Sequence, residues 1–399
     1  MINKIDDIFI LIYYKNFPNF IMPSTLSLNI SPFYVMEILD KAKEMEEGGE
    51  DIIHFEVGEP DFPTSGLVCD EAVDSIRKGY TKYTHSLGIA ELRSAISRKY
   101  KEEYKLKVSE DRVIVTMGSS PALFLTILSI IDSGDEVIIT DPHYACYPQL
   151  IKIAGGVPRF LKIYEDEFYQ IDVSRLKNLM SEKTKAIIIN SPSNPTGAIL
   201  SAELLSQLAG IGIDIISDEI YHGLVYDDEI NSMLEFKDDA FVINGFSKYY
   251  SMTGWRLGFC IVPRDFVRPI QKLQQNLFIS PCSFVQMAGI SAIEKAGFYS
   301  REMVDELNKR RLLMLSGLRG LGFDVSVEPK GAFYVFVNVK SLSMNSRDLA
   351  FDILEKSLVA VTPGIDFGES GEGYLRFSYA TSQEKIKEGV SRLGGYFNG

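Results

Sequence analysis

The amino-acid sequence predicts an α/β protein with a mostly parallel central sheet in a large domain and a smaller α+β domain after it. The first observation is that, from about residue 113, short β-branched runs alternate with helical patterns. The second is that these runs are continuously apolar, which is typical of parallel strands buried on both faces. The third is the length of 399 residues, which is sufficient for two domains.

Six apolar runs are expected to form strands of the large sheet. In chain order they are VIVT (113–116), EVIIT (136–140), AIIIN (186–190), IDIIS (213–217), FVIN (241–244) and LGFCIV (257–262). Helical patterns such as SSPALFLTILSIID and ILSAELLSQLAGIG separate several of them. A strand, a helix and a further strand in this order favour parallel pairing, because the helix carries the chain back across the sheet.

The remaining segments predict the domain organisation. Two long helical patterns, then FDVSVEPKGAFYVFVNV, an amphipathic SRDLAFDILEKSL and YLRFSYA, indicate a small domain at 288–399 after a large domain at 57–287. The segment 22–56 contains a helical pattern and is expected to pack with the small domain. Residues 1–21 are dense in Ile, Phe and Tyr without a clear period, and we expect the native start at Met22. The alternative is a flexible arm that docks on a neighbouring subunit.

Composition and charge narrow the class of protein. Hydrophobic residues make up 46% and charged residues 24%, as in ordinary globular proteins, and the formal charge of −13 argues against a nucleic-acid partner. The longest apolar stretches fall far short of the roughly 20 residues that cross a bilayer, and the N-terminus lacks the charge pattern of a signal peptide. The four cysteines form no CxxC, and the four histidines have no metal-ligand spacing. We expect a reduced, cytoplasmic protein without a metal site, with small-molecule substrates and no membrane or nucleic-acid partner.

Polar residues follow the predicted strands, where ligands bind in open parallel sheets. Gly118-Ser119-Ser120 follows the first run and opens a helix, so this turn is either a phosphate site or a simple serine cap. Tyr144 follows the second run and could cover a flat heterocycle, although such a tyrosine is often a core residue. Asn194 lies in the rigid turn SPSNPTG after the third run, where it serves the turn or points at a ligand.

The last two strand ends carry charge. Asp218 ends the fourth apolar region, where a buried acid is costly unless a cation or a hydrogen-bond donor meets it. After the fifth run, the segment GFSKYYSMTGWRLG places Ser247 and Lys248 eight residues or so before Arg256. A solvated loop would explain the cations alone. It would not explain why an acid, an amide and an amine follow successive strands.

One ligand accounts for all of these residues, namely pyridoxal 5'-phosphate. Its aldehyde requires a lysine, its ring nitrogen an anionic partner, and its phosphate requires serines, an arginine and a helix N-terminus. Its ring requires an aromatic face, and its phenolic oxygen requires donors such as an amide and a phenol. Each signal is weak alone, but their order at successive strand ends favours this cofactor.

Several motifs resemble those of one enzyme family. The motifs are VGEPDF (57–62), YTHSLGIAELR (83–93), SPSNPTG (191–197), SDEIY (217–221), SKYYSMTGWRLG (247–258), GAFYVF (331–336), PGIDFG (363–368) and LRFSYA (375–380). They resemble the class-I aminotransferases of the pyridoxal-phosphate fold-type I superfamily, of the aspartate aminotransferase kind. The resemblance runs from about Ser31 to the C-terminus, and SNPTG together with SKxxxxxGWRxG is specific for the group.

The resemblance implies roles for the residues around the ring. Lys248 would be the Schiff-base lysine and the group that moves a proton at the substrate Cα. Asp218 would keep the pyridine nitrogen protonated, and Asn194 and Tyr221 would bond the phenolic oxygen. Tyr144 would stack on the ring.

The resemblance also implies anion-binding residues. The phosphate would be held by Ser119, Ser120, Ser247 and Arg256. Tyr83 is similar to a tyrosine that reaches the cofactor of a partner subunit, which implies a homodimer. Arg376 would bind the substrate α-carboxylate through its planar fork, with help from Asn194 and the backbone of Gly58. The implied substrate-binding residues are Gly58, Tyr144, Asn194 and Arg376.

Two departures bear on phosphate and substrate binding. Gly245 stands where many relatives have a serine, so one phosphate hydroxyl is absent. A cation for a distal carboxylate is not evident, since Ser120 occupies a position where some branches have lysine and 276–286 holds no arginine. L-aspartate with 2-oxoglutarate in a ping-pong cycle is the first expectation. Alternatives are an alanine, aromatic or broad-specificity aminotransferase, a carbon–sulfur β-lyase, and lastly a cofactor-sensing regulator, which the short, non-basic N-terminus disfavours.

Overall fold

The computed structural model describes residues 23–398, and the chain divides into two units, residues 1–32 and 33–399. The described part of the first unit holds one short helix, α2 (Thr25–Asn29), whose first turn is capped because the Ser24 side chain accepts a hydrogen bond from the backbone N–H of Ser27. The prediction for residues 1–21, including a start at Met22, lies outside the described residues. All further elements belong to the second unit.

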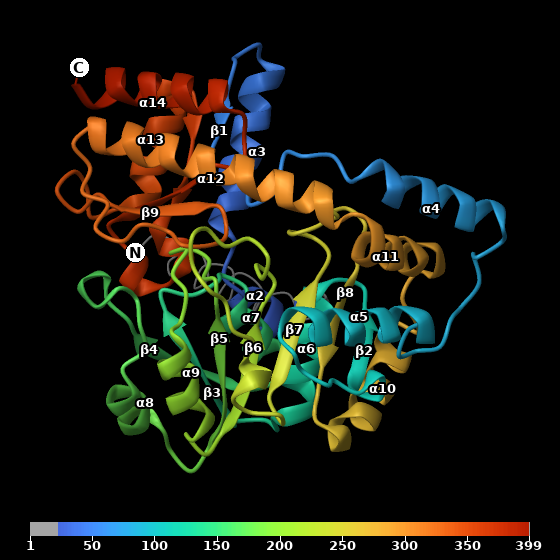
Figure 1. Ribbon diagram of the computed structural model, residues 1–399. Coiled ribbons are helices and arrows are strands. Elements are labelled where there is room, and N and C mark those ends of the chain that lie inside the picture. The colour runs from blue at the N-terminus through green and yellow to red at the C-terminus, as the bar shows by residue number, and fades with distance from the viewer. Residues whose placement is uncertain (1–22, 399) are drawn as a thin grey trace, which may run out of the picture. The chain divides into compact units, whose positions relative to one another are not determined.

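A seven-stranded sheet forms the centre of the second unit (Figure 1). Its strands are β2 (Val113–Thr116), β3 (Glu136–Asp141), β4 (Val157–Lys162), β5 (Thr184–Asn190), β6 (Asp214–Asp218), β7 (Phe241–Gly245) and β8 (Gly258–Ile261). The spatial order is β2-β8-β7-β6-β5-β3-β4, with β8 antiparallel to both neighbours and the pairs from β7 to β4 parallel. The predicted α/β class with a mostly parallel sheet is therefore confirmed, and only β4 was not expected.

Strand β4 escaped prediction because most of its residues are not buried. Its residues VPRFLK are mostly exposed or half-buried, so the continuous apolar run that marks the inner strands is missing. By contrast, β2 at the opposite edge of the sheet and the inner strand β7 are buried at every position. Burial on both faces, rather than strand formation itself, produces the pattern that a sequence reveals.

Helices cover both faces of the central sheet. They are α4 (Gly66–Arg77), α5 (Ala90–Glu103), α6 (Ser119–Ile130), α7 (Tyr147–Ile153), α8 (Val173–Leu179), α9 (Ala202–Ala209), α10 (Arg264–Leu277) and α11 (Ser283–Lys295). Successive residues of one strand enter opposite cores: Ile187 packs with residues of α5 and α9, whereas Ile188 packs with residues of α6 and α7. This alternation is the period of two expected of a strand between two helical layers.

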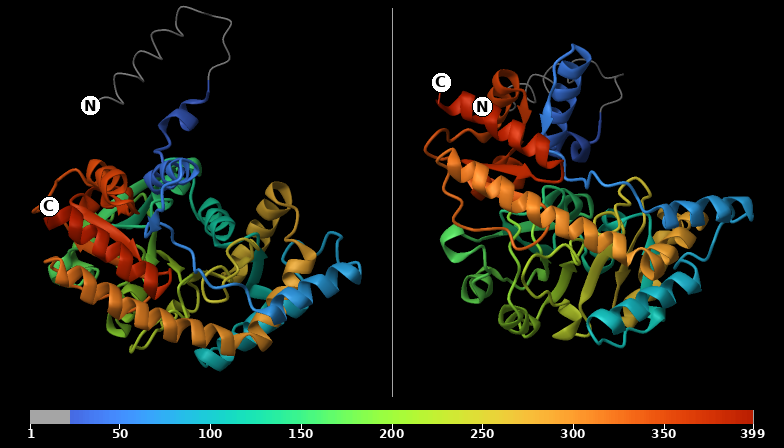
Figure 2. Two further views of the ribbon diagram at one scale, coloured as in Figure 1. Left: turned by 90° about the horizontal axis from the view of Figure 1, so that it is seen from above. Right: turned by 45° about the horizontal axis from the view of Figure 1, so that its top comes forward.

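A second layer contains the C-terminal strands and helices. Strands β9 (Tyr334–Asn338), β12 (Tyr374–Ser378) and β11 (Thr362–Pro363) form an antiparallel sheet, and β1 (Ile53–His54) pairs in parallel with β10 (Val359–Ala360). The helices there are α3 (Tyr34–Glu47), α12 (Gly297–Gly320), α13 (Ser346–Ser357) and α14 (Gln383–Asn398). In both views of Figure 2 the long helix α12 extends from the neighbourhood of α11 to that of α14, and it packs against α14 and β9. Helix α3 shares one hydrophobic core with these elements through Ile38 and Ala42.

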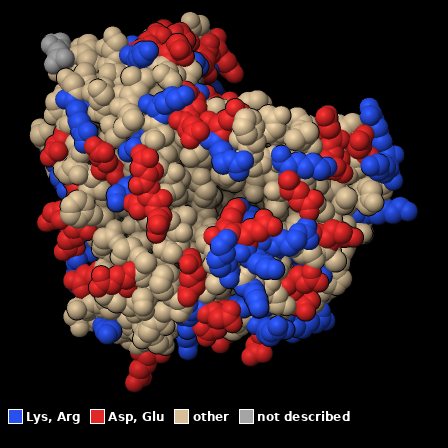
Figure 3. Space-filling view, in the orientation of Figure 1, with Lys and Arg blue, Asp and Glu red and all other residues tan. Residues whose placement is uncertain are grey.

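The predicted boundary between residues 287 and 288 falls within α11, a continuous helix that packs against α4 and α5. The division of the chain into domains therefore stays a prediction. On the face that Figure 3 shows, acidic and basic side chains are interspersed. No helix in the described part of the chain is both long and apolar enough to span a membrane.

Candidate active site

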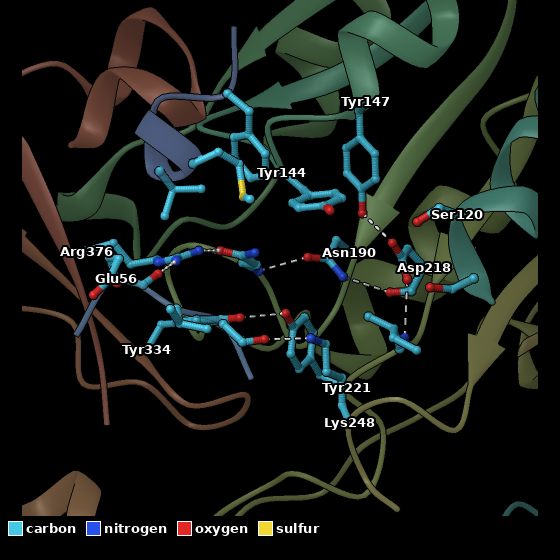
Figure 4. A pocket seen from close by; sticks show the side chains of 18 of the residues that line it. Glu56, Ser120, Tyr144, Tyr147, Asn190, Asp218, Tyr221, Lys248, Tyr334 and Arg376 are labelled. Atoms are coloured by element: carbon cyan, nitrogen blue, oxygen red, sulfur yellow. Dashed lines mark hydrogen bonds between the residues drawn. The ribbon is translucent and has the colours of Figure 1, made fainter. Parts of the chain in front are cut away.

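A cavity of about 200 Å³ lies at the carboxyl ends of β5 and β6, between the central sheet and the second layer. The sequence-predicted residues that line it are Gly58, Ser119, Ser120, Tyr144, Asn194, Asp218, Tyr221, Lys248 and Arg376. Figure 4 shows Arg376 and Tyr334 at one end of the cavity and Asp218 and Ser120 at the other. The predicted residues Ser247, Arg256 and Tyr83 do not line this cavity.

Lys248 supplies a partly buried amine. It follows β7 after the buried residues Phe246 and Ser247, and its Nζ donates a hydrogen bond to the carbonyl of Gly58 at 2.6 Å. Burial lowers the pKa of this amine to about 8, against the opposing effect of the Glu59 carboxylate. Because this pKa lies closer to neutral pH than that of an ordinary lysine, more of the amine is uncharged and able to act as a nucleophile or a base.

Asp218 supplies a buried carboxylate at the end of β6. Its Oδ2 accepts a hydrogen bond from the Tyr147 hydroxyl at 2.6 Å, and its Oδ1 accepts one from the backbone N–H of Ile220 at 3.2 Å. Burial raises the pKa of this carboxyl to about 6, and the Tyr147 hydroxyl opposes that rise by bonding the charged form. Asp218 is therefore mainly ionised at neutral pH and can pair with a protonated ring nitrogen.

Arg376 presents a guanidinium that is fixed on most sides. Its Nη1 donates to Asn194 Oδ1 at 2.9 Å, and its Nη2 donates to the Glu56 carbonyl at 2.6 Å and to Thr362 Oγ1 at 3.1 Å. The rings of Tyr334 and Phe367 lie 4.3 and 4.9 Å from its central carbon. Its buried Nε has no hydrogen-bond partner among the described residues. A buried donor without a partner is costly, and an incoming carboxylate would remove that cost.

Four tyrosines form another part of the cavity lining, namely Tyr144, Tyr147, Tyr221 and Tyr334. The hydroxyls of Tyr221 and Tyr334 lie 2.9 Å apart, so each phenol is held by the other. The ring of Tyr144 meets Tyr147 edge-on at 5.4 Å and Phe33 edge-on at 6.4 Å. Tyr144 is thus fixed by its neighbours and offers a face to a flat ligand.

The start of α6 forms a candidate anion cradle. Gly118 has a φ of +105°, and a Cβ there would lie 2.7 Å from Nη2 of Arg256, so only glycine allows the arginine to lie against this turn. Ser119 and Ser120 then open the helix, with no side-chain cap on its free N–H groups. Arg256 itself donates through Nη1 to the carbonyl of Thr253 at 2.8 Å. The backbone N–H groups and hydroxyls at this turn, which line the cavity, therefore lie close to the Arg256 guanidinium, which does not line it.

The departure at Gly245 also has a local reason. A Cβ at this position would lie 3.1 Å from the carbonyl of Leu257 and 3.2 Å from Cα of Gly258. A serine would therefore require β8 to move away from β7. Ser247 remains as the nearby hydroxyl of this segment and is buried. Tyr83, by contrast, is 82% exposed.

Several cavity residues were not identified from the sequence. Tyr147 lies three residues beyond Tyr144 in DPHYACY, and sequence reasoning selected only the first tyrosine. Tyr334 lies in the motif GAFYVF and Asn190 ends the run AIIIN. Both segments were recognised in the sequence, but neither residue was assigned a role. The start of α3 forms an apolar wall of the cavity, and no feature of the sequence indicated that these residues belong to the site. The residues of this wall are Phe33, Val35, Met36 and Leu39.

The residues present fit pyridoxal phosphate. A partly buried lysine, a buried carboxylate, an aromatic face and a helix N-terminus with an arginine beside it match the aldehyde, ring nitrogen, ring and phosphate of that cofactor. Arg376 Nε adds an unpaired donor where a substrate carboxylate would bind. No cluster of His, Cys, Asp or Glu suited to a metal ion occurs among residues 23–398.

Comparison with known proteins identifies the family. The model of the family "Aminotransferase class I and II" matches residues 50–393. The chain is 44% identical over 384 residues to the (5-formylfuran-3-yl)methyl phosphate transaminase of Methanocaldococcus jannaschii, covering 94% of this chain and 100% of that protein. It is 38% identical over 367 residues to the aspartate aminotransferase of Pyrococcus horikoshii, covering 90% and 93%.

Solved structures agree with this assignment. The Thermus thermophilus aspartate aminotransferase with maleate superposes with a TM-score of 0.91 at 33% identity, over 94% of this chain and 100% of that chain. A crystal structure from Methanococcus jannaschii, described as similar in its active site to kynurenine aminotransferases, has a TM-score of 0.88 at 44% identity, again over 94% and 100%. Sequence motifs, cavity chemistry and full-length likeness thus lead to one conclusion. The chain belongs to the class I and II aminotransferase family, and it is a pyridoxal-phosphate-dependent aminotransferase.

Proposed function

We propose that Lys248, Asp218 and Tyr221 carry the chemistry of amino transfer in this cavity. When bound, pyridoxal phosphate supplies an aldehyde that takes up the amino group and a ring that accepts electrons from the substrate Cα. Lys248 Nζ takes the proton from Cα and returns it, a task suited to an amine whose pKa is lowered to about 8. Asp218 keeps a proton on the ring nitrogen, and Tyr221 and Asn194 orient the phenolic side of the ring.

Anion contacts position cofactor and substrate in this proposal. Ser119, Ser120, Ser247 and Arg256 hold the phosphate, which anchors the ring while Lys248 moves. Arg376 binds the α-carboxylate of an L-amino acid through its free Nε, and the Gly58 backbone and Asn194 help to hold the same carboxylate. Tyr144 covers the ring face. The supporting observation is that Arg376 lines the cavity with one hydrogen bond on Nη1 and two on Nη2, while its Nε has no partner among the described residues.

The amino acceptor that we propose is (5-formylfuran-3-yl)methyl phosphate or an aldehyde of that class. The proposal rests on the 44% identity to a transaminase of this compound over its full length. A flat furan ring suits the apolar wall beside Tyr144, and this acceptor carries no carboxylate. Its phosphate would use Arg376 in turn with the donor's carboxylate, because the two substrates of a ping-pong cycle never occupy the cavity together.

Transfer from L-aspartate to 2-oxoglutarate is the second candidate. It is favoured by aspartate aminotransferases at 38% and 35% identity among the relatives. Each of these substrates carries a second carboxylate, which requires a second cation. Among the described residues that line the cavity, Lys248 and Arg376 are the only cations, and the present assignment uses both. The geometry therefore favours the first candidate.

A substrate panel tests the acceptor. We expect the purified holoenzyme to use (5-formylfuran-3-yl)methyl phosphate with a kcat/KM at least about tenfold above that for 2-oxoglutarate, because only the aldehyde leaves no second carboxylate unpaired. L-alanine, L-aspartate, L-glutamate and L-phenylalanine serve as donors in parallel. A higher kcat/KM for 2-oxoglutarate with L-aspartate would replace this proposal by the second candidate. Release of pyruvate and ammonia from cysteine conjugates measures the β-lyase alternative.

We further propose that the enzyme acts in the cytoplasm as a homodimer. Tyr83 is 82% exposed, and in a dimer it would reach the phosphate of the partner subunit's cofactor. Gel filtration of the holoenzyme is expected to give about twice the chain mass of 44.8 kDa. Tyr83→Phe should weaken cofactor retention without changing the elution volume. A monomer with full activity would contradict both points.

A further inference from the structure

The first turn of helix α3 is capped by a residue from the other end of the chain. Phe33 precedes the helix and makes no side-chain cap bond. Instead, the two carboxylate oxygens of Asp366 accept hydrogen bonds from the backbone N–H groups of Tyr34 and Val35, each at 2.8 Å. The free N–H groups at a helix start require acceptors, and a carboxylate there also meets the positive end of the helix dipole. Asp366 therefore fixes where α3 begins.

This same turn is one wall of the active-site cavity. Phe33, Val35, Met36 and Leu39 line it with apolar side chains. Phe33 meets the edge of Tyr144, the residue assigned to the cofactor ring, with the two planes at 83°. A shift in the start of α3 would therefore move the wall relative to the reacting atoms.

The segment that carries Asp366 is also held in place relative to Arg376. Asp366 lies in the short helix η4 (Gly364–Phe367). Phe367 of the same helix lies against the Arg376 guanidinium, and its carbonyl accepts a hydrogen bond from the backbone N–H of His143 at 2.9 Å. Beyond it, the Asp141 carboxylate accepts a hydrogen bond from the Ser370 hydroxyl at 2.9 Å. One segment thus connects the apolar wall to the arginine that would bind the substrate carboxylate.

We propose that Asp366 is a positioning residue that holds the first turn of α3 as a subsite for a flat or apolar substrate group, at a set distance from Arg376. A substrate bound through its carboxylate on Arg376 then gains affinity when it carries such a group. This inference rests on the proposed roles of the site and names the substrate class that they favour. Burial raises the pKa of Asp366 to about 6, so the residue is mainly ionised at neutral pH and able to accept both bonds.

Binding of unreactive carboxylates to the holoenzyme tests this inference. 3-Phenylpropanoate carries an apolar group and acetate does not, and both can be titrated by the absorbance of the bound cofactor. In the wild type, 3-phenylpropanoate should bind at least about tenfold more tightly than acetate. Asp366→Asn keeps the size of the residue but removes one acceptor oxygen. It should raise the Kd of 3-phenylpropanoate about fivefold and leave that of acetate within about twofold.

Asp172→Asn is the matched control. Asp172 caps α8 by accepting from the backbone N–H groups of Ser174 and Arg175, away from the cavity, and its substitution should change neither Kd. Met36→Gln is a second variant that needs no change in the core, because Met36 is 48% exposed. It should also weaken 3-phenylpropanoate selectively.

Two results would overturn the inference. One is a wild-type enzyme that binds 3-phenylpropanoate no more tightly than acetate. The other is an equal effect of Asp366→Asn and Met36→Gln on both ligands, which would indicate general loosening rather than loss of a subsite. Neither ligand reacts, so these results do not depend on which acceptor the enzyme uses. A failed acceptor panel and a failed subsite are therefore distinguishable.

Discussion

Lys248→Ala is expected to lower kcat/KM for amino transfer by at least about 10³-fold, because it removes the side chain that we propose as both the attacking amine and the proton carrier at Cα. The variant should also lose the absorbance band of lysine-bound cofactor, even when excess pyridoxal phosphate is present. Spectra and initial rates on the same preparation measure both effects. A variant that keeps the band and a tenth of the activity would show that another amine binds the cofactor and carries the proton.

The matched control for Lys248 is Lys99→Ala. Lys99 is also mostly covered, with 15% of its side chain exposed, but it pairs with Glu103 and lies over the Tyr249 ring outside the cavity. Its removal should leave the spectrum and kcat/KM within about twofold of the wild type. Loss of activity in both variants would point to a folding effect rather than to chemistry at Nζ.

The pH dependence of cofactor uptake gives an independent measurement on Lys248. In the proposed role the neutral amine is the nucleophile, and burial lowers its pKa to about 8, below the usual value for lysine. The cofactor-free protein should therefore take up pyridoxal phosphate faster as pH rises, with the rate levelling off above about pH 8. A rate that still increases steeply between pH 9 and pH 10 would mean that the amine is not desolvated in the free protein.

The half of the cavity that holds Asp218 and Lys248 was predictable because each of these residues stands at the end of a buried strand or just after one. Asp218 ends β6, and Lys248 follows β7 by three residues, so local patterns located both side chains at one sheet edge. The strands themselves were recognisable from their unbroken apolar runs. Unbroken apolar runs, together with the rule that ligands bind at the carboxyl ends of parallel strands, were sufficient to predict this half of the cavity.

The other half could not be predicted from local patterns, because it depends on contacts between distant segments. The bonds from Asp366 to Tyr34 and Val35 join positions more than 300 residues apart, and no periodicity encodes them. Tyr334 is one of several buried aromatics in β9 and its flank, and only packing reveals that its hydroxyl meets Tyr221. Tyr147 was overlooked for a related reason: whether Tyr144 or Tyr147 faces the acid depends on the turn of α7.

Arg376→Lys is expected to lower kcat/KM for L-amino acid donors by about 10²-fold, with most of the loss in KM. Lysine keeps the charge but cannot donate two parallel hydrogen bonds to a carboxylate, and it cannot also reach Asn194, Glu56 and Thr362. The rate at which each donor converts the bound cofactor, followed by absorbance in a single turnover, measures the effect without an acceptor.

Arg112→Lys separates recognition from stability. Arg112 is another buried arginine, and it donates to the Val262 carbonyl and to Asp238 away from the cavity. Its substitution should lower the Tm by several degrees, since it breaks buried hydrogen bonds, and leave the KM for donors unchanged. If Arg376→Lys behaved in the same way, with a lower Tm and an unaltered KM, Arg376 would hold the fold together rather than bind substrate. If the KM rises only in the Arg376 variant, the guanidinium of Arg376 binds the substrate carboxylate.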